Sequence, residues 1–151
     1  MIGSSRPSVV QINAEQPDAL CDTSAAIPLV VVDHEQHVQT SAALRGRRLG
    51  LCGHAAFEAF SVLTRLPPPL RRPPEIVRDI LVRSFPHSRF LGPKSAARLF
   101  DRFGELGIAG GSVYDALVAS TAIEHSVPLV TRDARAADVY RLLDAPFELL
   151  R

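Results

Sequence analysis

Short apolar runs alternate with longer helical segments through most of the chain, and this alternation constrains the fold more than any other feature. The longer segments carry apolar residues at helical spacing, and turn residues separate them from the short runs. The pattern predicts an α/β fold with a mostly parallel sheet and helices on both faces. The expected strands lie at 19–22, 47–52, 89–91, 128–131 and 147–150, and the expected helices at 25–32, 37–45, 55–66, 75–84, 94–106, 112–125 and 135–143.

The chain has 151 residues, which fits one domain. Residues 1–17 are polar and contain Pro7 and Pro17, so we expect a loose N-terminal extension ahead of a domain spanning 18–151. The sequence holds no apolar run of about 18 residues and no basic stretch followed by an apolar one near its start. It therefore predicts neither a membrane span nor a signal peptide, and we expect a cytoplasmic protein.

The net charge is only +1, which argues against a protein that binds nucleic acid over its whole surface. The cations are almost all Arg, with Lys94 the one lysine, so a local patch suited to phosphate remains open. The two cysteines, Cys21 and Cys52, lie in apolar runs without a zinc-type spacing. We interpret both as small buried hydrophobic residues.

Four acids stand where the predicted fold would bring them together. Asp22 closes the first strand, and Asp133 follows the strand at 128–131. Glu58 and Asp115 lie on predicted helices, Asp115 in a first turn. In an open parallel sheet, ligands bind beyond the carboxyl ends of the strands, so these side chains converge if the two helices pack over those ends.

Carboxylates gathered without cationic partners repel each other and resist burial. Mg²⁺ and Mn²⁺ favour oxygen ligands and resolve that conflict. A pair of such ions activates water and stabilises both oxygens of a phosphodiester displacement. The four acids therefore favour a metal site for phosphodiester hydrolysis.

Each acid also has a purely structural explanation. Asp115 follows Ser112 by three residues, which is a capping-box spacing with Ser112 as the cap. Asp133 suits a loop or cap, and Asp22 suits a turn ahead of a helix capped by Thr23 or Ser24. Glu58 is the hardest to explain in this way, because its neighbours make the helix apolar nearly all round. We also expect Pro28 to lie in the first turn of the helix at 25–32.

The acid-bearing segments resemble the motifs of PIN domains, in family order over about residues 19–150. Asp22 with Thr23 and Ser24 is similar to the opening Asp-Thr-Ser motif. Glu58, within residues 57–59, resembles the second acid of the family. Asp115, within residues 112–119, resembles the third motif. Thr131 ahead of Asp133, within residues 129–133, resembles the fourth. Each motif is weak alone, but the ordered set is specific.

The resemblance implies a three-layer α/β/α sandwich around a short, mostly parallel sheet. It implies Mg²⁺ or Mn²⁺ held chiefly by Asp22 and Asp115, with Glu58 and Asp133 completing the cluster. Hydrogen bonds that hold waters or orient the carboxylates would come from Thr23, Ser24 or Thr131. At this length the chain resembles VapC-type toxins, which cut RNA and are silenced by a cognate antitoxin. One departure is the 21 residues ahead of Asp22, more than such toxins usually have.

Arg132 and Arg135 flank Asp133 and are our candidates for RNA-backbone contacts. Trp is absent and aromatic residues make up 6% of the chain, so we expect no aromatic platform for base stacking. The phenylalanines at helical spacing are expected in the core or in a dimer interface. An apolar early-helix face would suit a homodimer, an antitoxin helix or this domain's own core; it comprises Ile27, Leu29 and residues 30–32.

Three alternatives to a nuclease remain. An aspartyl-phosphate phosphatase of the haloacid dehalogenase type needs a second acid where Ser24 stands. A receiver-like signalling module needs a lysine on a late strand, whereas Lys94 precedes a helix. A PIN-like scaffold that only binds a partner would keep the fold without catalysis.

Overall fold

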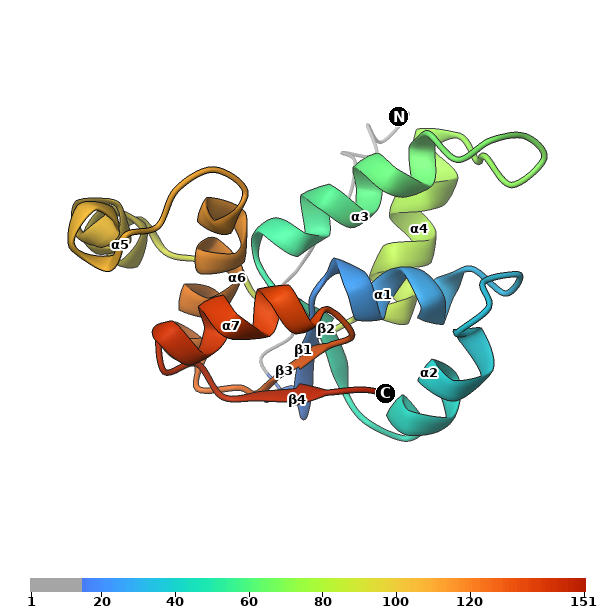
Figure 1. Ribbon diagram of the computed structural model, residues 1–151. Helices are drawn as coiled ribbons and strands as arrows, with labels where there is room; N and C mark the ends of the chain where they lie inside the picture. Colours follow the sequence, from blue (N-terminus) through green and yellow to red (C-terminus); the bar gives the residue numbers. More distant parts are fainter. Residues whose placement is uncertain (1–14) are drawn as a thin grey trace, which may run out of the picture.

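A computed structural model describes residues 15–151 and shows four short parallel strands between two layers of helices (Figure 1). The strand order is β2-β1-β3-β4. The strands are β1 (Ala19–Cys21), β2 (Leu49–Leu51), β3 (Leu129–Thr131) and β4 (Phe147–Leu149). The helices are α1 (Thr23–Val30), α2 (His37–Leu44), α3 (His54–Thr64), α4 (Pro74–Ser84), α5 (Pro93–Leu106), α6 (Ser112–His125) and α7 (Ala134–Leu142).

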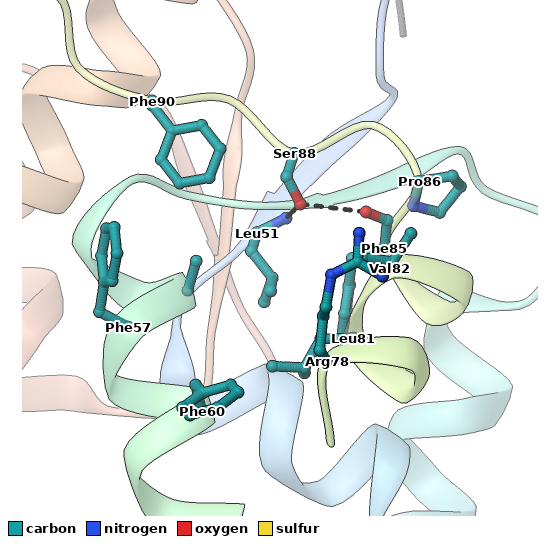
Figure 2. A pocket seen from close by; sticks show the side chains of 11 residues that line it. Leu51, Phe57, Phe60, Arg78, Leu81, Val82, Phe85, Pro86, Ser88 and Phe90 are labelled. Atoms are coloured by element: carbon teal, nitrogen blue, oxygen red, sulfur yellow. Dashed lines mark hydrogen bonds between the residues drawn. The ribbon is translucent and has the colours of Figure 1, made fainter. Parts of the chain in front are cut away.

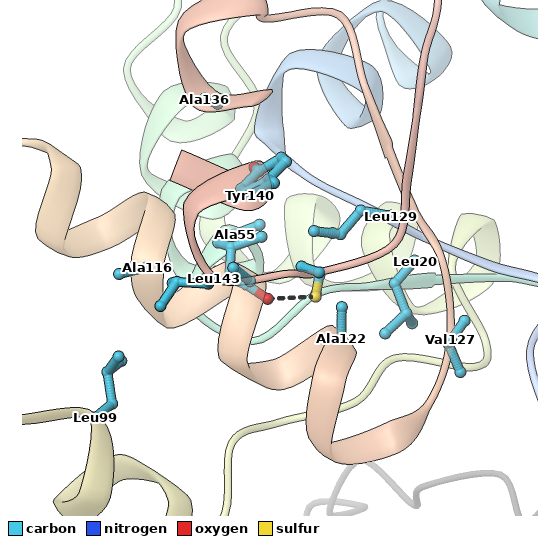
Figure 3. Close-up of a cluster of buried hydrophobic side chains, with 14 of the residues drawn as sticks. Leu20, Ala55, Leu99, Ala116, Ala122, Val127, Leu129, Ala136, Tyr140 and Leu143 are labelled. Atoms are coloured by element: carbon cyan, nitrogen blue, oxygen red, sulfur yellow. Dashed lines mark hydrogen bonds between the residues drawn. The ribbon is translucent and has the colours of Figure 1, made fainter. Parts of the chain in front are cut away.

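The two faces of the sheet bury different residues of the same strands. Leu20 and Leu129 pack with α5, α6 and α7, as Figure 3 shows. Cys21 and Val130 point the other way, toward α1, α3 and α4. This alternation buries both faces of β1 and β3, which is why these strands read as continuous apolar runs. The predicted α/β/α sandwich with a parallel sheet is confirmed.

The register places the ends of the central strands side by side. Cys21 pairs with Leu51 on one side and with Val130 on the other. All pairs are parallel, so the residues that follow β1 and β3 emerge at one edge of the sheet. Asp22 and Asp133 leave the sheet at that edge.

Several local expectations are wrong. The segment 89–91 forms only an isolated bridge between Arg89 and Cys52, since Gly92 and Pro93 start α5 directly after it. Asp22 itself caps α1 in place of Thr23 or Ser24, so the helix begins earlier and Pro28 lies in its interior, beyond the first turn.

The N-terminal end of the described chain is held against the domain. The guanidinium of buried Arg89 donates to the carbonyl oxygen of Glu15 at 2.7 Å. The Gln16 side chain donates to the carbonyl of His125 at 3.3 Å. Most of the extension expected at 1–17 lies outside the described residues.

Both cysteines are buried free thiols, as the sequence predicts. Burial raises the pKa of each thiol, and Cys52 Sγ donates to the carbonyl of Val118 at 3.2 Å. They lie on opposite faces of the sheet, Cys52 toward α6 and Cys21 toward α1. None of the helices between residues 15 and 151 is long and apolar enough to cross a lipid bilayer.

Candidate active site

The four predicted acids line a single small cavity of about 60 Å³ at the carboxyl edge of β1 and β3. They come from four separate segments: the end of β1, α3, α6 and the start of α7. The full lining is Asp22, Thr23, Ser24, Glu58, Asp115, Val118, Asp133, Ala136 and Tyr140. The geometric convergence that the sequence analysis requires is therefore present.

Asp22 is the most buried of the four acids and is held by donors on both carboxylate oxygens. Its Oδ1 accepts from Ser24 Oγ at 2.6 Å and from the backbone N–H of Ala25 at 3.2 Å. Its Oδ2 accepts from Tyr140 Oη at 2.8 Å. Burial raises the pKa of Asp22, and these hydrogen bonds act against that rise. The carboxylate is thus fixed in orientation at the floor of the cavity.

Hydroxyl groups join the ends of the two central strands. Ser24 Oγ lies 3.2 Å from Thr131 Oγ1 and accepts from the backbone N–H of Arg132 at 2.8 Å. Thr131 Oγ1 in turn accepts from the backbone N–H of Asp133 at 3.1 Å. The hydroxyls therefore set the positions of the acids at both strand ends.

Glu58 reaches the cavity from α3, on a turn of that helix that is partly exposed to solvent. Thr23 Oγ1 donates to its Oε2 at 2.9 Å, and His54 Nε2 lies 3.4 Å from its Oε1. Its side chain is 41% exposed, and neighbouring Phe57 is 64% exposed. The sequence argument that α3 is apolar all round and buries Glu58 is therefore wrong, although the residue does line the site.

Asp115 lies in the first turn of α6 and faces the other acids. The helix is capped by Gly111, and Ser112 makes no capping bond, so the capping-box explanation for Asp115 is wrong. Burial raises the pKa of Asp115 to about 6, and the charges of Asp133, Glu58 and Asp22 add to the rise. Its ionised form is thus costly in the absence of a counter-charge.

Asp133 combines a structural role with a place in the cavity. It is the N-cap of α7, where its Oδ1 accepts from the backbone N–H groups of Arg135 at 2.9 Å and Ala136 at 3.4 Å. The cap interpretation of the sequence is correct, and the same carboxyl group also lines the cavity. A capping bond fixes the carboxylate and does not preclude a ligand role.

The donor set suits a small, hard divalent cation. Within residues 15–151, no three acidic, His or Cys side chains already stand in the arrangement of a complete metal site. Even so, four carboxylates share about 60 Å³, and burial raises the pKa of two of them. Oxygen ligands with unbalanced negative charge favour a hard divalent cation over a softer one.

The two candidate arginines differ in their surroundings. The Arg132 guanidinium donates to Gln36 Oε1 at 3.0 Å and to Thr40 Oγ1 at 3.2 Å, which ties it to α2. Arg135 is exposed at the start of α7, and its charge acts to lower the pKa of Asp115. Of the two, Arg135 is therefore the exposed cation beside the cavity.

Sequence reasoning missed Tyr140. Its hydroxyl binds Asp22 from 118 positions further along the chain, and its ring is almost fully buried. Its position on α7 gives it the helical spacing of an ordinary core residue. The sequence carries no signal that separates it from the rest of the core.

A larger cavity of about 230 Å³ lies elsewhere, beneath α3 and α4 (Figure 2). Its lining is mainly apolar, with Phe57, Phe60 and Phe85 among the side chains and Arg78 as the charged one. It contains no carboxylate among its lining residues. The larger cavity therefore lacks the oxygen ligands that a metal site needs, whereas the smaller one has them.

Comparison with known proteins identifies the class of protein that has this fold. The PIN domain family matches residues 19–142. The chain is 44% identical over 125 residues to ribonuclease VapC27 of Mycobacterium tuberculosis, which covers 83% of this chain and 91% of that protein. It is 39% identical over 131 residues to ribonuclease VapC40 of the same species, covering 85% and 96%.

The chain therefore belongs to the PIN-domain family, in its VapC-type ribonuclease group. PIN domains are nucleases that hydrolyse phosphodiester bonds, so the predicted class of enzyme is confirmed. VapC-type PIN ribonucleases are generally metal-dependent. The phosphatase and receiver alternatives from the sequence lose their basis.

Proposed function

We propose that the four-carboxylate cavity is the active site of an endoribonuclease that acts as the toxin of a toxin–antitoxin module. Asp22 and Asp115 are its chief ligands for Mg²⁺ or Mn²⁺, and Glu58 and Asp133 complete the acidic cluster. The observation that carries the proposal is the convergence of these acids in one cavity with the pKa of Asp115 raised to about 6. Such a site remains strongly negative until a cation enters it.

The four carboxylates would hold a divalent cation, which would supply activation of water and neutralisation of charge on the scissile phosphate. The chain supplies the positioning. Tyr140 and Ser24 hold both oxygens of Asp22, so its carboxylate enters the site already oriented. Thr23 orients Glu58, and Thr131 connects the start of α7 to the first turn of α1.

RNA contacts in this proposal come from the cations beside Asp133. Arg135 is exposed and close enough to affect the pKa of Asp115. A guanidinium there binds an RNA phosphate as it enters the cavity. Arg132 is the weaker candidate, because its guanidinium already binds α2.

The partners proposed are RNA, a cognate VapB-type antitoxin and a second copy of the chain, in the cytoplasm. The early-helix face is mostly used in the chain's own core: Ile27 and Leu29 pack against buried residues. Val32 remains 74% exposed beside a groove that Leu63, Leu66 and Ile80 also line. This exposed end of the face is what remains for an interface.

The test is RNA cleavage by the purified protein. We expect cleavage of a structured RNA with Mg²⁺ or Mn²⁺ and none in EDTA. Asp115→Asn should lower the rate by at least about a hundredfold, because one ligand and its charge are lost. Asp101→Asn, at an exposed position on α5, is the matched control and should cleave like the parent. Full activity in EDTA, or in the folded Asp115→Asn variant, would rule out the proposal.

A further inference from the structure

Aromatic rings from α3 and α6 meet beside the acidic cavity. The rings of His54 and Tyr114 are stacked, with centroids 4.8 Å apart and planes at 18°. Phe57 extends this group, its centroid 6.4 Å from that of His54. We call these three residues the ring cluster. Its members lie up to 60 positions apart in sequence, so the cluster exists only in the folded chain.

The ring cluster is connected to the carboxylates through both helices. His54 Nε2 lies 3.4 Å from Glu58 Oε1, one turn along α3. Tyr114 directly precedes Asp115, and Val118, one turn further along α6, lines the cavity. Residues four apart share a helix face, so the His54 and Tyr114 rings flank the cavity on its α3–α6 side, while Phe57 lies further out, where it also lines the apolar cavity under α3.

The rings are exposed where a core role would bury them. Phe57 is 64% and Tyr114 49% exposed, while His54 covers one face of the Tyr114 ring. The fold thus presents flat apolar surface directly beside a strongly negative cavity. A ligand for both must combine a metal-neutralised anion with an adjoining aromatic plane, and a nucleotide has that composition.

We propose that an unpaired RNA base next to the scissile phosphate stacks on the ring cluster, chiefly on Tyr114. This inference rests on the proposed function, since the phosphate is placed by the acidic cavity. It departs from the expectation, drawn from composition, that the chain has no aromatic platform for base stacking. A base inside a duplex is already stacked, so the platform selects unpaired nucleotides at the cleavage position.

The test measures binding separately from cleavage. The probe is a short single-stranded RNA carrying one 2-aminopurine, whose fluorescence falls when the base stacks. It is titrated into the Asp115→Asn protein, which does not cleave the RNA and is the parent in this experiment. It is also titrated into the parent carrying Tyr114→Ala, Tyr114→Phe or Phe100→Ala. Phe100 is the matched control, an aromatic residue 73% exposed on α5.

We expect quenching with the parent, Tyr114→Phe and Phe100→Ala proteins. Tyr114→Ala should lose the quenching and bind roughly tenfold more weakly. An RNA with an abasic position in place of 2-aminopurine should bind the parent as weakly as the 2-aminopurine RNA binds Tyr114→Ala. Tyr114→Ala should not weaken binding of this abasic RNA any further. Thermal melting of each variant verifies that it is folded.

The inference fails if Tyr114→Ala binds as well as the parent, which would leave the rings as a protein-contact surface. It also fails if Tyr114→Ala weakens the abasic RNA by the same factor, because the ring would then act without a base. Metal-dependent cleavage by the wild-type chain is assayed in parallel. If the wild-type chain cleaves RNA with metal but the stacking result is negative, only the platform is rejected. If the wild-type chain does not cleave RNA, the proposed nuclease function is rejected.

Discussion

Carboxylates in the cavity share one electrostatic problem at the scale of single residues. Burial is the largest cause of the raised pKa at both Asp22 and Asp115. At Asp115 the charges of Asp133, Glu58 and Asp22 add to it, so the pKa of this residue reports the repulsion among the carboxylates. Stability in the absence of metal should therefore depend on the Asp115 charge.

Replacing Asp115 by Asn should stabilise the metal-free protein at neutral pH. In the fold its pKa rises from 3.8 to about 6, so the free energy of unfolding falls as the pH rises between those values. Since the side chain is partly exposed, we expect a cost of about 1 kcal/mol after solvent screening. The Asn variant should then melt about 2–4 °C higher above that window, as measured by thermal unfolding in EDTA.

The direction of the pH dependence makes this result diagnostic. Below pH 3.8 both proteins carry a neutral group at position 115, so their Tm values should converge. Asp101→Asn, on the exposed side of α5, should show no such dependence. If the Tm of the Asn variant relative to the parent rose on acidification, the surroundings would instead stabilise the ionised form of Asp115.

The sequence predicts those residues of the cavity that have a local signal and misses those that depend on distant contacts. The four acids were found because each stands in a recognisable local context, at a strand end or on a helix. Tyr140 and the His54–Tyr114 pair were not found, because their roles depend on contacts across 118 and 60 positions. The local argument for Glu58 is wrong about its burial, since α3 exposes part of that face, although Glu58 does line the cavity.

At the scale of elements, the central strands were predictable because burial on both faces makes them apolar apart from Thr131. The bridge at Arg89 was mistaken for a strand because nothing local shows how soon α5 begins. The chain there runs alongside β2: the N–H of His87 donates to Leu49 O at 3.0 Å, and that of Arg89 to Leu51 O at 3.1 Å. This approach depends on Gly50, which lies between them.

Gly50→Ala should be strongly destabilising. A Cβ at Gly50 would overlap the main-chain carbonyl of His87, so the segment paired with β2 has to move away. We expect a loss of about 3 kcal/mol, or roughly 6–12 °C in Tm, measured by thermal unfolding.

Gly104→Ala is the matched control, because a Cβ on this α5 glycine meets nothing within 4 Å. It should raise stability by about 0.5–1 kcal/mol through its better helix propensity. Equal effects at the two positions would show that the close approach at Gly50 does not exist in solution.

At the scale of the whole molecule, the site exists because all four strands run in one direction and end at one edge. The order β2-β1-β3-β4 puts the ends of β1 and β3 next to each other, and α3, α6 and α7 bring the remaining acids over them. Sequence alternation predicts the parallel sheet but not this order. The order follows from pairing between segments far apart in the chain, which a local sequence pattern does not contain.

The burial of Cys21 and Cys52 on opposite faces of the sheet has a practical consequence. Thiols that are buried and resist ionisation react with alkylating reagents only when the chain around them opens. Cys21 therefore reports on the layer that contains α1, and Cys52 on the layer that contains α6. Mass spectrometry after timed alkylation should show equal rates if the molecule opens as one unit. Unequal rates would reveal which half of the sandwich loosens first, with no label engineered into the protein.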